Sequence, residues 1–321
     1  MKIVVATIMT LIGLCGHAVC SAADYPTKPI RFIVGYLQGG GNDIIARLVG
    51  AKLQEALGQP VIIENRPGAD TIIAAEFVAK SAPDGYTILV NAMGGMTVTP
   101  ALHAKLPYDP LKDFVPISII ARFPHVLAVN PSVPVGSVTE LVAYAKANPR
   151  KLNYGSSGTA MQLVTEMFAQ MTGISLTHIP YKGSSASVQA LVSNEVQLAI
   201  ADLPPMLPHI KTGRVKTLAV TSADRMKAMP SLPTFVEAAG LTGFDISPWV
   251  GLFAPAGTPA AVITSLNSQL IRLVKLPDVE EKLSFLGAEP VGDSPEQAAN
   301  RLRADIKRFD AAARMIKINA R

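Results

Sequence analysis

The order of apolar and polar residues in the first hundred positions alternates between two periods. Short runs rich in Val and Ile, bounded by Gly, Pro, Asn or Asp, are typical of buried strands. Longer stretches place apolar residues three or four positions apart, as amphipathic helices do. The pattern predicts strands at 30–34, 61–64 and 86–90, and helices at 43–57 and 71–80. Strands that alternate with helices indicate a mostly parallel sheet covered on both faces.

A second series of the same kind begins near Val126. Ser137, with Glu140 three positions later, forms a capping-box signature and predicts a helix that ends at about Ala147. Thr258-Pro259 and Ser294-Pro295 each place an N-cap residue before a proline at the first helical position, so the C-terminus is predicted to be helical. The remaining predicted elements are strands at 126–129, 152–154, 179–181, 197–200, 217–220 and 252–254, and a helix at 159–172.

Two α/β lobes accommodate this pattern. The chain has 321 residues, and domains usually hold about 100 to 200. The chain is expected to cross between the lobes near residues 117–128 and to return near 244–254. The predicted division therefore places residues 24–125 and 246–321 in lobe 1, and residues 126–245 in lobe 2.

The first residues have the layout of a secretory signal peptide. Lys2 precedes an uncharged apolar run, and small residues surround Ala22 and Ala23. The run is too short to span a bilayer, which needs about 20 apolar residues. We expect residues 1–23 to be cleaved and the mature protein to be exported. Cys15 and Cys20 both lie in this segment without a lipobox, so the mature chain must rely on its core rather than on disulfides.

The charge distribution argues against a nucleic-acid partner. The formal net charge is only +5 at pH 7, and the basic residues are dispersed except in the stretch 301–321. A nucleic-acid site needs a basic face with interleaved aromatic residues. Here alanines, Asp305 and Asp310 interleave the basic residues, which favours a solvated helix face.

Two kinds of catalytic centre require spacings that this sequence lacks. The histidines of the mature chain, His103, His125, His178 and His209, stand far apart and form no HExxH pair, so no metal site is predicted. A serine nucleophile would sit in G-x-S-x-G, and the segment 155–158 is one residue too short for that motif. We therefore expect no catalytic residue and no turnover.

A dinucleotide-binding unit is the more serious alternative. Strand, glycine-rich turn, helix and a second strand that ends at Glu64 copy the order of a Rossmann half. The spacing fails, because after Gly39 and Gly41 the third small residue of the motif would fall at Ile44. Export also places the protein away from a cytoplasmic nicotinamide pool, so we expect no cofactor.

Three glycine- or serine-rich loops open predicted helices at Gly39–Asn42, Ser156–Thr159 and Gly183–Ser185. The first amide N–H groups of a helix have no internal partner, and the helix dipole makes that end positive. Glycine lets a ligand approach these groups closely. From the residues alone, an anion site and ordinary turns explain these loops equally well.

Asp202 follows the predicted strand 197–200. Its carboxylate would repel a carboxylate ligand and would favour an amine or hydroxyl if it faced the cleft. Capping of a helix that begins before Pro204 explains the residue at least as well.

A series of short motifs runs in one order along nearly all of the mature chain. They are Tyr25-Pro26-x-Lys28-Pro29-Ile30, Gly39-Gly40-Gly41-x-Asp43-x-x-Ala46-Arg47, Glu64-Asn65-Arg66-Pro67-Gly68-Ala69, Ala82-Pro83-Asp84-Gly85-Tyr86-Thr87, Leu106-Pro107-Tyr108-Asp109-Pro110, Leu152-Asn153-Tyr154, Pro180-Tyr181-Lys182-Gly183, Leu218-Ala219-Val220-Thr221-Ser222 and Gly251-Leu252-Phe253-Ala254-Pro255-Ala256-Gly257-Thr258-Pro259. In these motifs the chain resembles the substrate-binding receptors of tripartite tricarboxylate transporters, also called Bug-type receptors.

The resemblance implies an α/β, two-lobe periplasmic-binding-protein fold with a ligand cleft between the lobes. It implies a monomer that captures a small carboxylate, such as a dicarboxylate, an aromatic carboxylate or an acidic amino acid, and delivers it to membrane permease subunits. A ligand sensor for a signalling partner and an exported enzyme are the alternatives. The residues that the resemblance implies for ligand binding are Tyr36, Gln38, Gly39, Gly40, Asn42, Met93 and Gly94 in lobe 1, and Ser156, Ser157, Thr159, Tyr181, Ser184 and Asp202 in lobe 2.

Two departures from the family pattern fall in these loops. The family usually carries Pro-[Phe/Tyr]-x-Pro before the glycines, whereas Gly35 and Gln38 stand here in place of the prolines. The loop after Ser157, at residues 158–162, is also shorter than usual. The identity of the ligand therefore does not follow from the resemblance.

Overall fold

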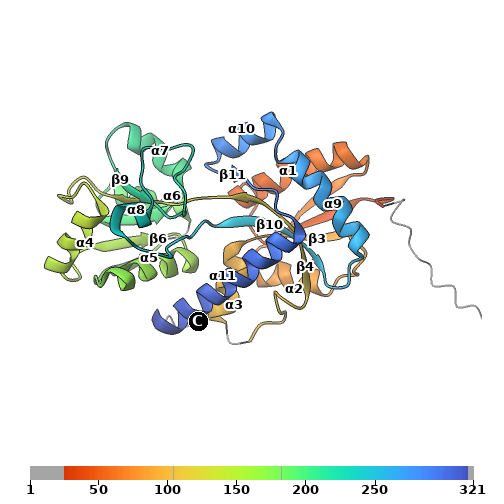
Figure 1. Ribbon diagram of the computed structural model, residues 1–321, viewed down its shortest axis with the longest axis horizontal. Helices are drawn as coiled ribbons and strands as arrows, with labels where there is room; N and C mark the ends of the chain where they lie inside the picture. Colours follow the sequence, from red (N-terminus) through yellow and green to blue (C-terminus); the bar gives the residue numbers. More distant parts are fainter. Residues whose placement is uncertain (1–24, 104, 182, 317–321) are drawn as a thin grey trace, which may run out of the picture.

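The computed structural model describes residues 25–103, 105–181 and 183–316. The predicted signal peptide, residues 1–23, lies outside the described residues. Two α/β lobes lie side by side along the longest axis of the molecule, and each is built around one sheet (Figure 1). Within the described part of the chain, no helix is both long and apolar enough to cross a membrane.

The sheet of lobe 1 has six strands in the order β11-β4-β10-β3-β1-β2. Its strands are β1 (Ile30–Val34), β2 (Val61–Asn65), β3 (Thr87–Ala92), β4 (Phe114–Arg122), β10 (Trp249–Pro255) and β11 (Glu289–Pro290). The helical segments of this lobe are α1 (Gly41–Leu57), η2 (Ala69–Thr71), α2 (Ile72–Ala79), the π-helical turn η3 (Gly94–Val98), α3 (Thr99–Leu102), α9 (Ala260–Leu273), α10 (Pro277–Phe285) and α11 (Pro295–Ile316).

Helices cover both faces of this sheet because successive strand side chains point to opposite sides. Phe32 of β1 belongs to the apolar cluster of α1 and α9, which includes Leu53 and Leu270. The next residue, Ile33, belongs to the cluster on the other face, with Val78 of α2. The strand is therefore apolar at consecutive positions, as the sequence indicated.

The sheet of lobe 2 has five strands in the order β7-β6-β8-β5-β9. Its strands are β5 (Val126–Val129), β6 (Asn153–Ser156), β7 (Thr177–Pro180), β8 (Leu198–Ala201) and β9 (Lys216–Val220). Its helices are α4 (Val138–Ala147), α5 (Thr159–Thr172), α6 (Ser184–Val192), α7 (Leu203–Lys211) and α8 (Phe235–Ala239).

The prediction of mostly parallel sheets is confirmed only in part: β1 is parallel to β2 and β3, and β6 is parallel to β7 and β8, but each sheet also contains antiparallel pairs. β10 is antiparallel to both β3 and β4, and β5 is antiparallel to both β8 and β9. The reason lies in the path of the chain. β4 leads directly into β5 in the other lobe, and β10 brings the chain back. A strand that enters a sheet from the neighbouring lobe runs away from the cleft, whereas β1, β3, β6 and β8 run towards it.

Two links join the lobes, and they are hydrogen-bonded to each other. The amide of Phe123 in the first link donates to the Pro248 carbonyl in the second at 2.6 Å. The first link is also bonded to lobe 2, because the amide of Thr221, which follows β9, donates to the His125 carbonyl at 3.0 Å. The Thr221 hydroxyl in turn accepts from the amide of His125 at 3.0 Å. We retain the division into residues 24–125 with 246–321 and residues 126–245 as a proposal, and these links lie at its limits.

The long helix α11 contacts both lobes. It packs on β4, η3 and α3 of lobe 1 and on α5 of lobe 2, as its diagonal course in Figure 1 shows. Phe309, Ala312 and Ala313 share an apolar cluster with Leu163 and Phe168 of α5. Because this burial spans both lobes, α11 stabilises the observed arrangement of the two sheets.

The predicted helix starts have three outcomes. The cap of α11 is confirmed as a reciprocal box, because the amide of Gln297 donates to the Ser294 hydroxyl and the amide of Ser294 to the Gln297 side chain. Ser137 caps α4, but the Glu140 carboxylate accepts from the amide of Gly136 instead of completing the box. The predicted cap by Thr258 is wrong, since its hydroxyl donates to the Pro255 carbonyl.

Candidate functional site

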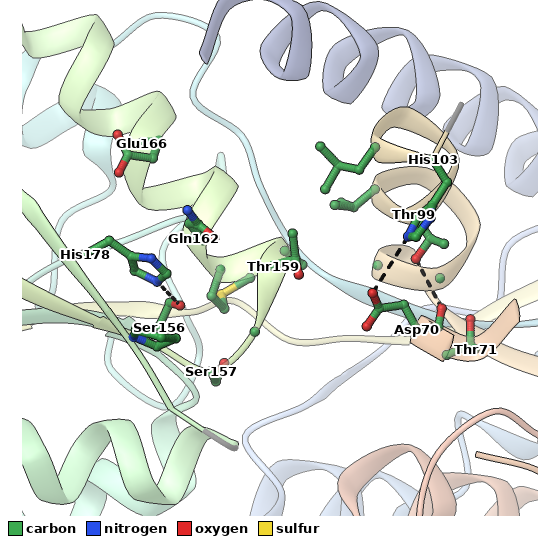
Figure 2. A pocket seen from close by; sticks show the side chains of 18 of the residues that line it. Asp70, Thr71, Thr99, His103, Ser156, Ser157, Thr159, Gln162, Glu166 and His178 are labelled. Atoms are coloured by element: carbon green, nitrogen blue, oxygen red, sulfur yellow. Dashed lines mark hydrogen bonds and ion pairs between the residues drawn. The ribbon is translucent and has the colours of Figure 1, made fainter. Parts of the chain in front are cut away.

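A cavity of about 860 Å³ lies between the two lobes. Its lobe 1 wall comes from the β1–α1 loop, η2, η3 and α3, and its lobe 2 wall comes from β6, β7 and α5. The lining residues are Tyr36, Asp70, Thr71, Gly94, Gly95, Val98, Thr99, Leu102 and His103 from lobe 1, and Ser156, Ser157, Gly158, Thr159, Ala160, Met161, Gln162, Glu166, His178 and Pro180 from lobe 2. Figure 2 shows polar side chains from both lobes around this space.

The start of α5 forms the centre of the lobe 2 wall. Gly158, with φ of 147°, turns the chain from β6 into the helix, a conformation that favours glycine. No side chain caps this helix. The amide groups of its first turn therefore lack both an intrahelical acceptor and a side-chain cap, and they carry the positive end of the helix dipole. Ser157 and Thr159 add hydroxyl groups at the same edge of the cavity.

Two hydrogen-bonded pairs lie behind this helix start. The Ser156 hydroxyl lies 2.7 Å from Nε2 of His178, and the Tyr154 hydroxyl donates to Glu166 at 2.5 Å. Burial lowers the pKa of His178, although the Glu166 carboxylate partly opposes this effect. Burial and the adjacent Glu166 carboxylate raise the pKa of Tyr154 well above its ordinary value.

The Ser156–His178 pair lacks the geometry of an activated nucleophile. A catalytic serine needs a histidine base that a third group orients. Among the described residues, no hydrogen bond joins His178 to a carboxylate, because Glu166 accepts from Tyr154 instead. Ser156 itself is only 1% exposed. The pair therefore orients the wall of the cavity.

A strained segment of backbone forms part of the lobe 1 wall. Ala69, Asp70 and Thr71 have φ of 47°, 49° and 74°, the left-handed region that non-glycine residues rarely adopt. Neighbouring groups hold the segment: Asn91 donates to the Thr71 hydroxyl at 3.1 Å, and the Thr99 hydroxyl donates to the Asp70 carbonyl at 3.1 Å. Strain of this kind concentrates at ligand sites, where the surrounding structure sustains it.

The π-helical turn η3 brings a second segment of lobe 1 to the cavity. A Cβ atom on Gly95 would lie 2.1 Å from the Thr71 hydroxyl and 2.6 Å from Oδ1 of Asn91. The turn and the strained segment therefore fit together only because residue 95 has no side chain. π-turns of this kind occur often at functional sites.

The cavity brings together five of the thirteen predicted ligand residues. They are Tyr36, Gly94, Ser156, Ser157 and Thr159. The remaining predicted residues lie outside its lining. These are Gln38, Gly39, Gly40, Asn42, Met93, Tyr181, Ser184 and Asp202.

In the predicted glycine loop, one of the protein's own carboxylates accepts from the amide that precedes α1, whose first turn has no side-chain cap. Asp43 accepts from the amide of Gly39 at 2.9 Å, from Arg47 at 2.9 Å and from Asn65 at 2.9 Å. These hydrogen bonds oppose the effect of burial and hold the pKa of Asp43 below its ordinary range. Asp43 thus remains an anion at neutral pH and occupies this part of the loop. Met93 is buried in the core of lobe 1.

The predicted lobe 2 residues outside the lining make contacts within that lobe. Tyr181 packs close to Gly155, and burial together with the Glu195 carboxylate raises the pKa of Tyr181 to about 12. The Ser184 hydroxyl accepts from the amide of Asp202 at 3.2 Å. Asp202 begins α7 without a side-chain cap, and its carboxylate lies 3.0 Å from Nε2 of His125 in the link between the lobes.

Four of the lining residues that were not among the predicted ligand residues show which sequence signals exist. Gln162 and Glu166 follow Thr159 at helical spacing, so a helical wheel of the predicted helix could have found them. Thr71 and His103 carry no such signal, because non-glycine positive φ and a π-turn place them at the cavity. No group of three or more His, Cys, Asp or Glu residues in the described segments is arranged to hold a metal ion.

Substitution of Asp202 by asparagine should change how stability depends on pH. Burial favours protonation of Asp202, but the charge of His125 and hydrogen bonds from His125 and Ser184 outweigh it and lower the pKa. A lowered carboxyl pKa contributes stability above the unfolded value, about 3.9, that is lost as the pH falls through the folded value. We expect Asp202→Asn to be less stable at pH 6 and to lose less stability below about pH 4. Urea unfolding at both pH values measures this, and parallel curves for the two proteins would contradict it.

Comparisons with known proteins agree with this geometry. The sequence pattern of the family described as tripartite tricarboxylate transporter family receptor matches residues 45–318. Protein BugT of Bordetella pertussis is 36% identical over 313 residues, which cover 96% of each chain. Rpa4515 of R. palustris, solved with adipate, is 38% identical with a TM-score of 0.79, and the match covers 92% of this chain and 99% of that one. MatC of Rhodopseudomonas palustris, solved with bound malate, is 31% identical with a TM-score of 0.75 over 90% of this chain and 99% of that one.

Proposed function

The chain belongs to the tripartite tricarboxylate transporter receptor family, and on that premise we propose that it is a periplasmic receptor that captures a small carboxylate between its lobes. The observation that carries the proposal is the uncapped start of α5 at the wall of the interlobe cavity. A monomer that releases its ligand unchanged to a membrane permease is the corresponding mode of action. The predicted signal peptide would direct the chain to the periplasm.

The start of α5 suits a carboxylate for an electrostatic reason. Its first amide groups present several donors in one direction, and the helix dipole places about half a positive charge there. Each dipole interaction contributes about 0.3 to 1 kcal/mol, so useful affinity requires several donors to converge. Ser157 and Thr159 supply hydroxyl donors beside these amides.

Residues of lobe 1 would contact the ligand from the opposite side of the cavity. Tyr36, Thr71 and the backbone of Gly94 and Gly95 face the cavity from that lobe. A ligand held between these groups and α5 would favour the arrangement in which the lobes lie close together, because it contacts both lobes. The related Rpa4515 and MatC, with adipate and malate respectively, make aliphatic dicarboxylates and hydroxycarboxylates the first compounds to test.

A negative charge at residue 157 is expected to weaken carboxylate binding without harming the fold. Ser157→Asp places a carboxylate beside the start of α5, where acidic groups stabilise helices. The same charge would repel and replace the ligand. We expect the Kd to rise at least about tenfold, and Ser157→Asn, which has a similar shape without the charge, should change it much less.

Calorimetry and thermal unfolding with a panel of aliphatic, aromatic and amino-substituted carboxylates test both the variant and the proposal. A ligand present at 100 times its Kd should raise the free energy of unfolding by about 2.7 kcal/mol. Wild-type protein that binds none of the panel would contradict the proposed function. Equal affinity in Ser157→Asp and Ser157→Asn would contradict the assignment of the carboxylate to the start of α5.

A further inference from the structure

Glu166 places a carboxylate without a cationic partner at the wall of the cavity. It lies on α5, is partly buried and lines the cavity together with Gln162 and Thr159. Among the described residues, no lysine, arginine or histidine forms an ion pair with it. Its one protein hydrogen bond comes from the buried hydroxyl of Tyr154. Partial burial of an uncompensated charge is costly, so it indicates a partner that is supplied from the cavity.

The groups around Glu166 do not neutralise it. Burial lowers the pKa of His178, which keeps the imidazole uncharged near neutral pH, and its Nε2 is already engaged by Ser156. Gln162, one turn earlier on α5, is polar and uncharged. Figure 2 shows these side chains at successive turns of α5 and on the strands beside it. Glu166 therefore gives the lobe 2 wall of the cavity a net negative charge.

The opposite wall has the same sign. Asp70 lines the cavity from lobe 1, and its side chain is 65% exposed. Nε2 of His103 lies 3.9 Å from the Asp70 carboxylate, beyond hydrogen-bond distance. The two carboxylates lie on opposite walls, and the start of α5 lies between them in Figure 2. Along α5 itself, the positive helix start and Glu166 lie about two turns apart, which separates an anion-binding end from a cation-binding end.

We propose that Glu166, with Gln162 beside it, recognises an ammonium group at the far end of the ligand, so that this receptor takes an amino-carboxylate in preference to a dicarboxylate. The inference rests on the proposed function, because the start of α5 must hold the ligand's carboxylate. A second carboxylate on the ligand would meet the charge of Glu166 and would be repelled. An ammonium would instead gain a charge-assisted hydrogen bond, which is roughly twice as strong as a neutral one.

Helix geometry sets the length of such a ligand. Thr159 and Glu166 are seven residues apart on α5, or about 10 Å along its axis. Helical side chains lean back towards the N-terminus, so the Glu166 carboxylate reaches towards the preceding turn and shortens this gap. An extended chain of about six carbons therefore matches the distance between the two ends.

Four ligands of equal chain length test the proposal: 6-aminohexanoate, 6-hydroxyhexanoate, hexanoate and adipate. Calorimetry at neutral pH should rank wild-type affinity in that order. In Glu166→Gln, which keeps an oxygen acceptor for Tyr154, 6-aminohexanoate should weaken at least about tenfold relative to adipate. The matched control is Glu281→Gln, which removes the same charge from an exposed position of α10 and should leave the ranking unchanged.

The outcomes separate this inference from the proposed function. Wild-type protein that binds adipate as tightly as 6-aminohexanoate would overturn the inference and leave the carboxylate receptor intact. An unchanged affinity ranking of the four ligands in Glu166→Gln would likewise overturn the inference and leave the carboxylate receptor intact. Failure of all four compounds and of the wider carboxylate panel would overturn the proposed function and the inference with it.

Discussion

Gly95→Val is expected to destabilise the protein by about 3 kcal/mol and to weaken ligand binding at least about tenfold. A Cβ at this position would lie 2.1 Å from the Thr71 hydroxyl and 2.8 Å from Nδ2 of Asn91. These two atoms are hydrogen-bonded to each other. The valine must therefore displace Thr71 from the cavity wall and leave a buried amide of Asn91 without its partner. Urea unfolding and calorimetry with the best ligand of the panel measure the two effects.

The adjacent glycine provides a matched control. Gly94 also lines the cavity, yet a Cβ there would meet only Ala160, at the ordinary contact distance of 3.6 Å. Gly94→Ala should change the free energy of unfolding by less than about 1 kcal/mol. If Gly95→Val proved as stable as Gly94→Ala, the close fit of η3 against the strained segment would not be the constraint inferred here.

The same contacts account for one departure from the family pattern. A Cβ on Gly35 would lie 2.8 Å from Cβ of Thr71. A proline at position 35, where the family usually has one, would collide with the threonine. The glycine and the threonine thus form a compatible pair, and the departure follows from the residue that faces it across the wall. No comparable contact explains Gln38, whose side chain is exposed.

Local signals in the sequence were sufficient for most elements and for the start of α5. Gly158 and the polar residues before it mark a strand-to-helix turn, and the helix that follows has the predicted bounds of 159–172. These signals are short-ranged, since a turn and a helix start depend on neighbouring residues. The antiparallel course of β10 depends instead on how the chain returns from the other lobe, which no local pattern encodes.

The candidate site was harder to predict because its residues converge only in the folded chain. Gly39 has the expected glycine-loop conformation, with φ of 81°, but Asp43 satisfies its amide. The amide that Asp43 satisfies precedes α1, whose first turn also has no side-chain cap. An uncapped helix start therefore does not identify the site by itself, and its place in the folded chain decides whether it reaches the cavity. Thr71 joins the site through a backbone conformation that its residue type disfavours.

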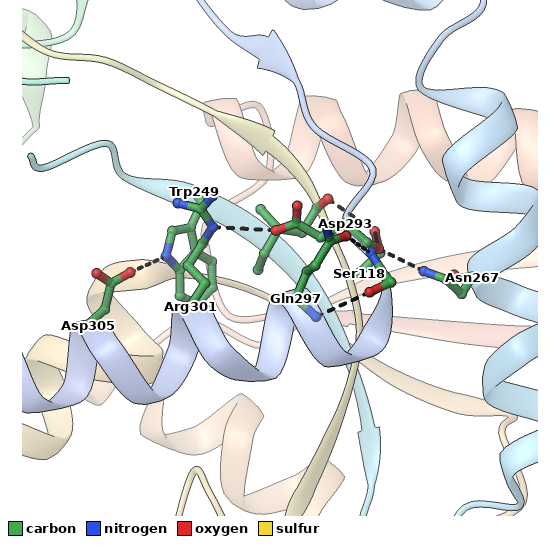
Figure 3. A network of polar contacts seen from close by, with 9 residues as sticks. Ser118, Trp249, Asn267, Asp293, Gln297, Arg301 and Asp305 are labelled. Atoms are coloured by element: carbon green, nitrogen blue, oxygen red, sulfur yellow. Dashed lines mark hydrogen bonds and ion pairs between the residues drawn. The ribbon is translucent and has the colours of Figure 1, made fainter. Parts of the chain in front are cut away.

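Trp249→Phe is expected to lower the free energy of unfolding by about 2 to 4 kcal/mol, because it removes a buried hydrogen bond between β10 and α11. Trp249 is 1% exposed, and its indole N–H donates to the Asp305 carboxylate at 2.8 Å. Figure 3 shows this bond beside the polar contacts that hold the first turns of α11, including Arg301 to Asp293. Loss of the indole donor leaves a buried carboxylate with Arg308 as its remaining partner. Thermal and urea unfolding measure the loss.

The pH dependence identifies the cause of that loss. Burial raises the pKa of Asp305, although Trp249 and Arg308 oppose the effect. A raised carboxyl pKa means that its contribution is fully present below the unfolded value, about 3.9, and is lost as the pH rises through the folded value. Without the indole N–H, the charged form of Asp305 is still less favourable. Trp249→Phe should therefore lower the free energy of unfolding more at pH 7 than near pH 4. A cost caused by a smaller ring alone would be the same at both pH values. Asp305→Asn should reduce the cost of Trp249→Phe at pH 7 by about 1 kcal/mol or more in a double-mutant cycle, because the buried charge is then absent.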